Sequence, residues 1–91
     1  MWDERALIFP ESGERYDSAR MVVLFSGNNG DKVVPCAISR EALEDHFEGG
    51  EREPLKAFRK HRARIEHEVL RKYLAGRLES DGSVLIKSAD L

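Results

Sequence analysis

The sequence predicts an α+β domain in which an antiparallel sheet carries a short and a long helix on one face. Segments typical of strands gather in the first 38 residues, segments typical of helices follow, and a last strand comes near the end, in the order β-β-β-α-α-β. Strands that precede helices in this way are typical of α+β folds. A chain of 91 residues has the length of one domain with one core, so we expect residues 1–91 to form a single domain.

The three early strands are predicted from short apolar runs that end at residues favouring turns. Ala6–Phe9 is stopped by a proline, which suits a brief edge strand. Met21–Phe25 is rich in large and β-branched side chains, and the cluster Ser26–Asp31 after it contains residues that adopt positive φ easily. We expect this cluster, with Gly27–Gly30 at its centre, to form a hairpin turn, and Lys32–Ile38 to form the returning strand.

The helical region is predicted to contain a short helix and a long one. Ser39 can cap a helix over Arg40–Phe47, because its hydroxyl can accept a hydrogen bond from a backbone N–H of the first turn. Pro54–Ala75 begins with proline, where a helix needs no N–H, and meets no breaker before Gly76, so it is predicted as one uninterrupted helix. Ser83–Lys87 then alternates as a last strand that must rejoin the sheet.

One face of the long helix is predicted to pack on the sheet. At about 100° per residue its apolar side chains share one stripe, formed by Leu55, Phe58, Ile65, Val69 and Tyr73. Arg62 and Glu66 lie in the same stripe, four residues apart, where opposite charges can pair. Two interpretations stay open: both side chains flank the core with their stems on apolar surface, or they form a polar anchor that fixes a partner or a loop.

Positive charge is concentrated in one segment. Residues 55–77 hold eight basic and two acidic side chains, although the whole chain has a formal net charge of -2. Opposite the apolar stripe lies the basic helix face, formed by Lys56, Lys60, Arg64, His67 and Arg71. A line of cations attracts anionic partners. We therefore interpret the protein as a non-enzymatic binding or accessory module that presents this face, on an uninterrupted helix, to an acidic protein partner.

A solvated surface is the alternative interpretation of the basic helix face. It would be balanced by the acidic side chains of the first helix and of the residues after it, Glu41, Glu44, Asp45 and Glu48. Nucleic acid fits the face less well than an acidic protein does. Few aromatic side chains interleave the cations, and no helix-turn-helix, zinc-finger or RNA-recognition pattern accompanies them.

A second functional hypothesis, from another class, is a small-molecule-binding or catalytic domain that uses a polar cluster of Cys36, His61, Arg62 and Glu66. Such a cluster requires a concave pocket. A lone cysteine beside apolar residues of a strand is more often a small buried hydrophobe than a nucleophile. His61 and His67 are six residues apart, whereas histidine ligands that share a helix face are four apart, so we expect no metal site and no cofactor.

Neither the N-terminus nor the apolar runs of the sequence predict contact with a membrane. The longest apolar run, Met21–Phe25, is far short of the roughly 18 residues that a spanning helix requires. The N-terminus is acidic and polar where a secretory signal is basic and then apolar, so we expect a cytoplasmic protein.

A homodimer joined through an unpaired strand edge is a further hypothesis. Pro10 and Pro35 support it because they suggest strand edges, but they also oppose it because proline hinders edge pairing.

A set of short motifs in a fixed order covers most of the chain, from Ile8 to Ile86. It comprises Ile8-Phe9-Pro10, Cys36-Ala37-Ile38-Ser39 with Glu41-Ala42-Leu43, Ala57-Phe58, His61-Arg62 with Ile65-Glu66, and Asp81-Gly82-Ser83-Val84. In this combination the sequence resembles the bacterial domain of unknown function family fourteen-eighty-eight, whose members are single small domains. The resemblance implies a compact α+β fold with a closing strand, and it implies no known activity and no catalytic residues.

Overall fold

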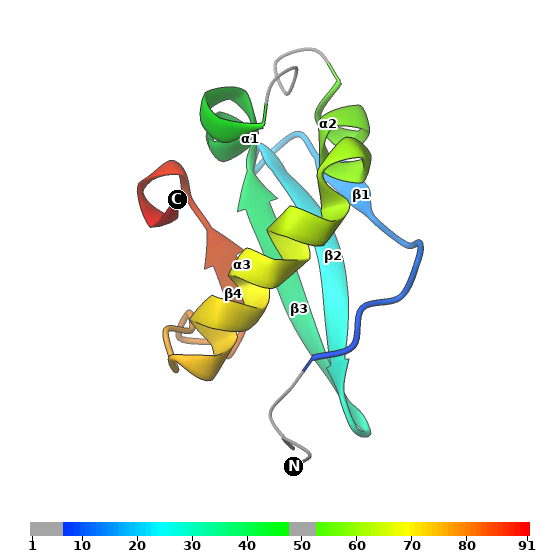
Figure 1. The fold of residues 1–91 in the computed structure, drawn as a ribbon, viewed down its shortest axis with the longest axis vertical. Helices are drawn as coiled ribbons and strands as arrows, with labels where there is room; N and C mark the ends of the chain where they lie inside the picture. The colour runs from blue at the N-terminus through cyan, green and yellow to red at the C-terminus, as the bar shows by residue number, and fades with distance from the viewer. Residues whose placement is uncertain (1–6, 48–52) are drawn as a thin grey trace.

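A computed structural model describes residues 7–47 and 53–91. Four strands form one sheet in the order β1-β2-β3-β4, and the helices α2 and α3 lie across one of its faces (Figure 1). The elements are β1 (Arg15–Asp17), β2 (Val22–Asn29), β3 (Lys32–Ser39), α1 (Arg40–His46), α2 (Pro54–Lys60), α3 (Arg62–Leu74), β4 (Val84–Ile86) and a 3₁₀ helix, η1 (Ser88–Asp90). The predicted α+β class is confirmed.

The pairing of the last strand departs from the predicted antiparallel sheet. β1, β2 and β3 pair antiparallel, but β4 pairs with β3 in parallel, with Cys36 opposite Val84 and Ile38 opposite Ile86. The physical reason is the connection, because the helices between β3 and β4 carry the chain back along the sheet before β4 begins, as a parallel crossover requires. Pro35, which has no N–H to donate, lies just before the part of β3 that β4 joins.

The turn between β2 and β3 is shorter than predicted. The ladder runs from Val22 opposite Ser39 to Asn29 opposite Lys32, which leaves a turn of two residues that begins at Gly30, with φ of 66°. The expectation of a turn over Gly27–Gly30 is therefore wrong, because Gly27 lies inside β2. Glycine at this position lets the segment around Leu7 pack closely against β2, since a Cβ at position 27 would lie 3.3 Å from the Leu7 Cβ.

The N-terminal part of the sheet also differs from the prediction. In the predicted strand Ala6–Phe9, whose first residue lies outside the described residues, Ile8 forms only an isolated bridge with Asn28, through two backbone hydrogen bonds of 2.9 and 2.8 Å. The regular strand β1 follows instead over Arg15–Asp17. The sequence analysis missed β1, because its Arg-Tyr-Asp composition carries no apolar run.

The short helix forms as predicted, and the long one does not. Ser39 caps α1, where its hydroxyl accepts a hydrogen bond from the Ala42 N–H at 3.0 Å. The predicted uninterrupted helix Pro54–Ala75 is wrong, because the chain leaves helical geometry at His61 (φ -112°, ψ 22°), which divides it into α2 and α3. No glycine or proline marks this break. The helices on its two sides both contribute side chains to one core.

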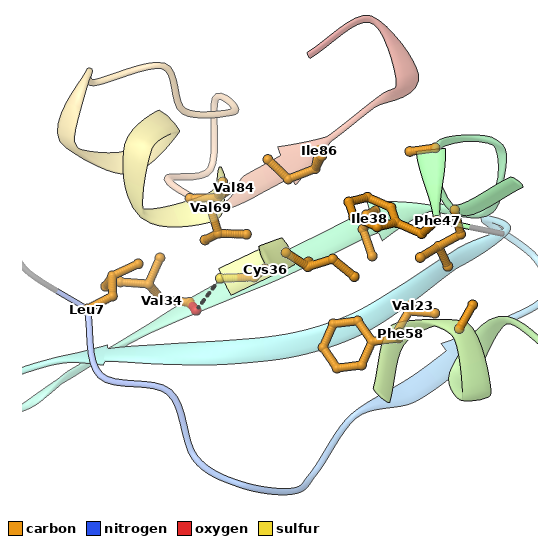
Figure 2. Packing of buried hydrophobic residues seen from close by; sticks show 14 residues of the cluster. Leu7, Val23, Val34, Cys36, Ile38, Phe47, Phe58, Val69, Val84 and Ile86 are labelled. Atoms are coloured by element: carbon orange, nitrogen blue, oxygen red, sulfur yellow. Dashed lines mark hydrogen bonds between the residues drawn. The ribbon is translucent and has the colours of Figure 1, made fainter. Parts of the chain in front are cut away.

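The core lies between the helices and one face of the sheet (Figure 2). The apolar stripe predicted for the long helix is confirmed: Phe58, Ile65 and Val69 are fully buried, and Leu55 and Tyr73 are partly buried against the same cluster. The sheet contributes the side chains Val23, Val34, Cys36, Ile38, Val84 and Ile86. These residues come from β2, β3 and β4, so burial under the helices joins three strands into one core.

The close approach at Gly27 gives a test of the fold. We expect Gly27→Ala to lower the free energy of unfolding by about 1–3 kcal/mol, the usual cost of overpacking, because the added Cβ meets Leu7 and Phe9 at 3.2–3.3 Å. Ser26→Ala, on the other face of the same strand, should stay within about 0.5 kcal/mol of the wild type. Urea unfolding measures both, and equal stability of the two variants would contradict the packing described.

Candidate functional site

The basic helix face is exposed, but it is divided between two helices. Its members Lys56 and Lys60 lie on α2, and Arg64, His67 and Arg71 lie on α3; all five are exposed. The break at His61 therefore replaces the predicted continuous line with a pair and a trio.

Three members of this face contact side chains of the protein itself. The Lys56 Nζ lies 3.7 Å from a Glu53 carboxylate oxygen, and Arg71 donates to Glu68 at 2.9 Å. The Arg64 guanidinium lies over the Phe47 ring, 5.0 Å from its centroid. Within residues 7–47 and 53–91, no ion pair involves Lys60 or His67. Because exposed pairs of this kind contribute little, they leave the face able to attract an external anion.

Two acidic side chains of the first helix contact groups outside the basic helix face. Glu44 pairs with Arg40 at 3.0 Å within α1, and Asp45 accepts a hydrogen bond from the Ser88 hydroxyl. No ion pair of the described residues joins α1 to the basic helix face, and Glu48 lies outside them. The carboxylates of α1 instead stabilise the helix itself and dock the C-terminal η1.

Arg62 belongs to a polar anchor whose other residues sequence reasoning did not identify. The partner is Glu14, whose side chain is 6% exposed: Arg59 Nε donates to its Oε2 at 2.7 Å, and Arg62 Nη2 lies 2.6 Å from its Oε1. Arg62 and Glu66 are farther apart, at 3.8 Å. The interpretation of a polar anchor that fixes a loop therefore describes Arg62, which holds the segment before β1 against the helices.

Electrostatics at this anchor, the Glu14 clamp (Glu14, Arg59 and Arg62), follow from its geometry. Hydrogen bonds from Arg59 and Arg62 lower the pKa of Glu14 from 4.5 to about 2. Burial raises the pKa of Glu66, and the nearby Arg62 opposes that shift. The clamp joins the last turn of α2 and the first turn of α3 to one carboxylate, so it acts on the fold.

The structure does not assemble the alternative polar cluster of Cys36, His61, Arg62 and Glu66 into a site. Cys36 is buried in the core, its thiol donates to the Val34 carbonyl oxygen at 3.4 Å (Figure 2), and burial raises its pKa to about 12. The His61 ring packs against Phe47, with centroids 5.3 Å apart. A thiol with so high a pKa is a poor nucleophile.

None of those four residues lines either of two hollows on the described surface. The smaller hollow, of about 110 Å³, lies beside the end of α3, where Lys72 Nζ donates to the Leu85 carbonyl oxygen at 2.6 Å and to Asp90 at 2.9 Å. These bonds hold β4 and η1 in place. The larger hollow, of about 410 Å³, lies over Val22 and Leu85. Sequence reasoning missed both, because their residues come from distant segments.

The fold and these sites define a small two-layer α+β domain. Within residues 7–47 and 53–91, no group of histidine, cysteine, aspartate and glutamate side chains could hold a metal ion. In the same residues no helix combines the length and the apolar character needed to cross a bilayer.

The chain belongs to the family described as protein of unknown function (DUF1488), whose model matches residues 7–86. It is similar in fold to the crystal structure of a DUF1488 protein of unknown function from Shewanella loihica PV-4, with a TM-score of 0.76 and 20% identity. That similarity covers 90% of this chain and 92% of the other. No curated protein matches the sequence significantly. The resemblance noted in the sequence is confirmed, and the crystal structure supports the fold.

The Glu14 clamp predicts a loss of stability in acid. Because the pKa of Glu14 falls from 4.5 to about 2 on folding, its ionised form stabilises the protein above pH 4.5, and this contribution is lost as the pH falls through that interval. The Arg59 side chain is 57% exposed, so water screens the pair, and we expect the clamp to contribute about 1–2 kcal/mol at pH 7.

Urea unfolding of the wild type and of Glu14→Gln measures this contribution. The two free energies of unfolding should differ at pH 7 and converge near about pH 2.5, where little of the carboxylate contribution remains. The same difference at both pH values would show that the substitution acts through packing and not through the charge.

Proposed function

We propose that this protein is a non-enzymatic binding module that presents the basic helix face, Lys56, Lys60, Arg64, His67 and Arg71, to an acidic segment of a partner protein. The observation that carries the proposal is the exposure of all five side chains on the helices that bury their other face in the core. The proposal places the module in the cytoplasm.

The distribution of charge supports an acidic partner. Residues 55–77 carry a surplus of six positive charges, from eight basic and two acidic side chains, within a chain of net charge -2. One of those two acidic residues, Glu66, is turned toward Arg62, and the other, Glu68, pairs with Arg71. Local potential, rather than net charge, steers an anion toward a surface.

The internal contacts of the face are compatible with binding. Lys56 and Glu53 are both more than two-thirds exposed, and an exposed pair of this kind contributes at most about 1 kcal/mol. A carboxylate of a partner can replace such a contact at little cost. Arg64 is exposed, and its guanidinium lies over the Phe47 ring, 5.0 Å from the centroid, an arrangement that orders the side chain before a partner arrives.

A charge-reversal variant tests this proposal. Lys60→Glu with Arg71→Glu changes one exposed cation on each helix, and we expect it to weaken binding of fluorescein-labelled polyglutamate at least about tenfold. Fluorescence anisotropy at low and at physiological salt measures the affinity, which should fall as salt rises. The thermal stability of the variant should stay close to that of the wild type, because both side chains are exposed.

The matched control carries the same change of charge elsewhere. Arg15→Glu with Lys32→Glu alters two exposed cations on β1 and β3, outside the basic helix face, and its affinity for polyglutamate should stay within about twofold of the wild type. Equal weakening by both double variants would show that only net charge matters and would contradict the proposed face. If the protein binds single-stranded DNA tightly and does not bind polyglutamate, the partner of this face is a nucleic acid and not an acidic protein.

A further inference from the structure

The sheet face turned away from α2 and α3 carries apolar side chains of its own. Alternate residues of a strand point to opposite faces, and Val22 and Ala37 are buried without belonging to the core cluster. The register places Leu24, Ala37 and Leu85 side by side across β2, β3 and β4. We call this surface the open sheet face. Its apolar row crosses three strands, so it is a continuous feature of the sheet.

Large exposed hydrophobic side chains extend the open sheet face at both ends. Val33 on β3 is 61% exposed, and Ile8, which bridges to Asn28 opposite Val33, is 72% exposed. At the other end Met21, between β1 and β2, is 52% exposed. Isolated exposed apolar residues are common on proteins, but these lie on one face, with the apolar row between them.

A groove of about 410 Å³ occupies the end of this face near Met21. Val22, Leu85 and Met21 supply its apolar floor and wall, and the charged residues that line it are Arg20, Arg40, Glu41 and Lys87. Three of these four are cations. Arg40 already pairs with Glu44, so Arg20 and Lys87 are the two cations of the rim that we consider for contact with a ligand. The groove therefore combines apolar surface with a positive rim in a protein of net negative charge.

Met21 adds a second observation at the same place. Its φ of 57° lies in the left-handed region, and Met21 is the only non-glycine residue of the described chain with a positive φ. Asparagine or glycine would adopt this conformation more easily. A large apolar side chain is thus held, half exposed, on the wall of the groove, at a backbone position that favours small residues. The local backbone does not explain why methionine stands there.

We propose that the open sheet face docks an acidic segment of a partner protein, whose apolar side chains lie on Val22, Leu85 and Met21 and whose carboxylates meet Arg20 and Lys87. Charge complementarity favours this occupant over a second copy of the chain. In a twofold interface the same patch meets itself, which would bring the two positive rims together. This surface lies on the opposite side of the sheet from the basic helix face, and its test is independent of that proposal.

A partner segment fits the surface better than a small ligand does. Small-molecule sites bury most of the ligand, whereas here the same face continues from the groove along β3 through Ala37 and Pro35 to the exposed Val33. A chain of residues can follow that path with alternate side chains toward the sheet. The groove then serves as the anchoring end of a longer contact.

The test uses a soluble peptide of alternating leucine and glutamate as the probe. Titration into the ¹⁵N-labelled protein, followed by NMR, should shift the amides of Met21, Val22, Leu85 and Lys87 more than those of α2 and α3. Arg20→Glu with Lys87→Glu should weaken binding at least about tenfold, while Lys32→Glu with Arg77→Glu, which changes two exposed cations outside both proposed surfaces, should leave the affinity within about twofold. Polyglutamate, which has no apolar side chains, should not shift these amides.

A substitution at Met21 separates binding from folding. Met21→Asn removes the apolar side chain at a position where asparagine tolerates the backbone conformation, so we expect an unchanged or higher melting temperature and an affinity for the leucine–glutamate peptide lowered about fivefold or more. Unchanged affinity would overturn the proposal. Amide shifts confined to α2 and α3 would also overturn it.

Two other outcomes would assign the surface to a different occupant. Equal amide shifts on titration with octanoate would assign the groove to small amphiphiles. Self-association detected by light scattering, and abolished by Val33→Asp, would assign the face to a second copy of the chain.

Discussion

The structure depends on the burial of one face of a four-stranded sheet. Val23, Cys36 and Ile86 from three strands meet Phe58 and Val69 from the helices in one cluster, and hydrophobic burial is the dominant favourable contribution to folding. A two-layer arrangement covers the sheet on one side only. It leaves two surfaces for contact with other molecules. The outer side of the helices carries the basic helix face, and the open sheet face carries the groove near Met21.

The break at His61 lies between two helices that both cover the sheet. Phe58 and Ile65, on either side of it, are both fully buried, and the Glu14 clamp links Arg59 before the break to Arg62 after it. One carboxylate thus couples the direction of two helices to the segment that leads into β1. The same break divides the basic helix face, so its cations are set by the packing of the core and not by the period of a single helix.

Local signals in the sequence predicted the elements that depend on local interactions. The Ser39 cap, the strands at the hairpin and the apolar stripe through Phe58 and Val69 follow from residue type and spacing. The break at His61 could not be predicted, because no glycine or proline marks it and the residues around it favour a helix. The Glu14 clamp and the groove were missed for a related reason, since each is assembled from segments that are distant along the chain.

The rest of the structure depends on the helices covering only one face of the sheet. The reactivity of thiols on the two faces of β3 measures this directly. Val33 and Cys36 lie on opposite faces of this strand, the first 61% and the second 2% exposed. In the variant Val33→Cys, a chromogenic disulfide reagent at mildly alkaline pH should modify one thiol per folded chain rapidly, and Cys36 should react only after unfolding in denaturant. Rapid reaction of Cys36 in the folded wild type, or protection of the thiol introduced at position 33, would contradict the account.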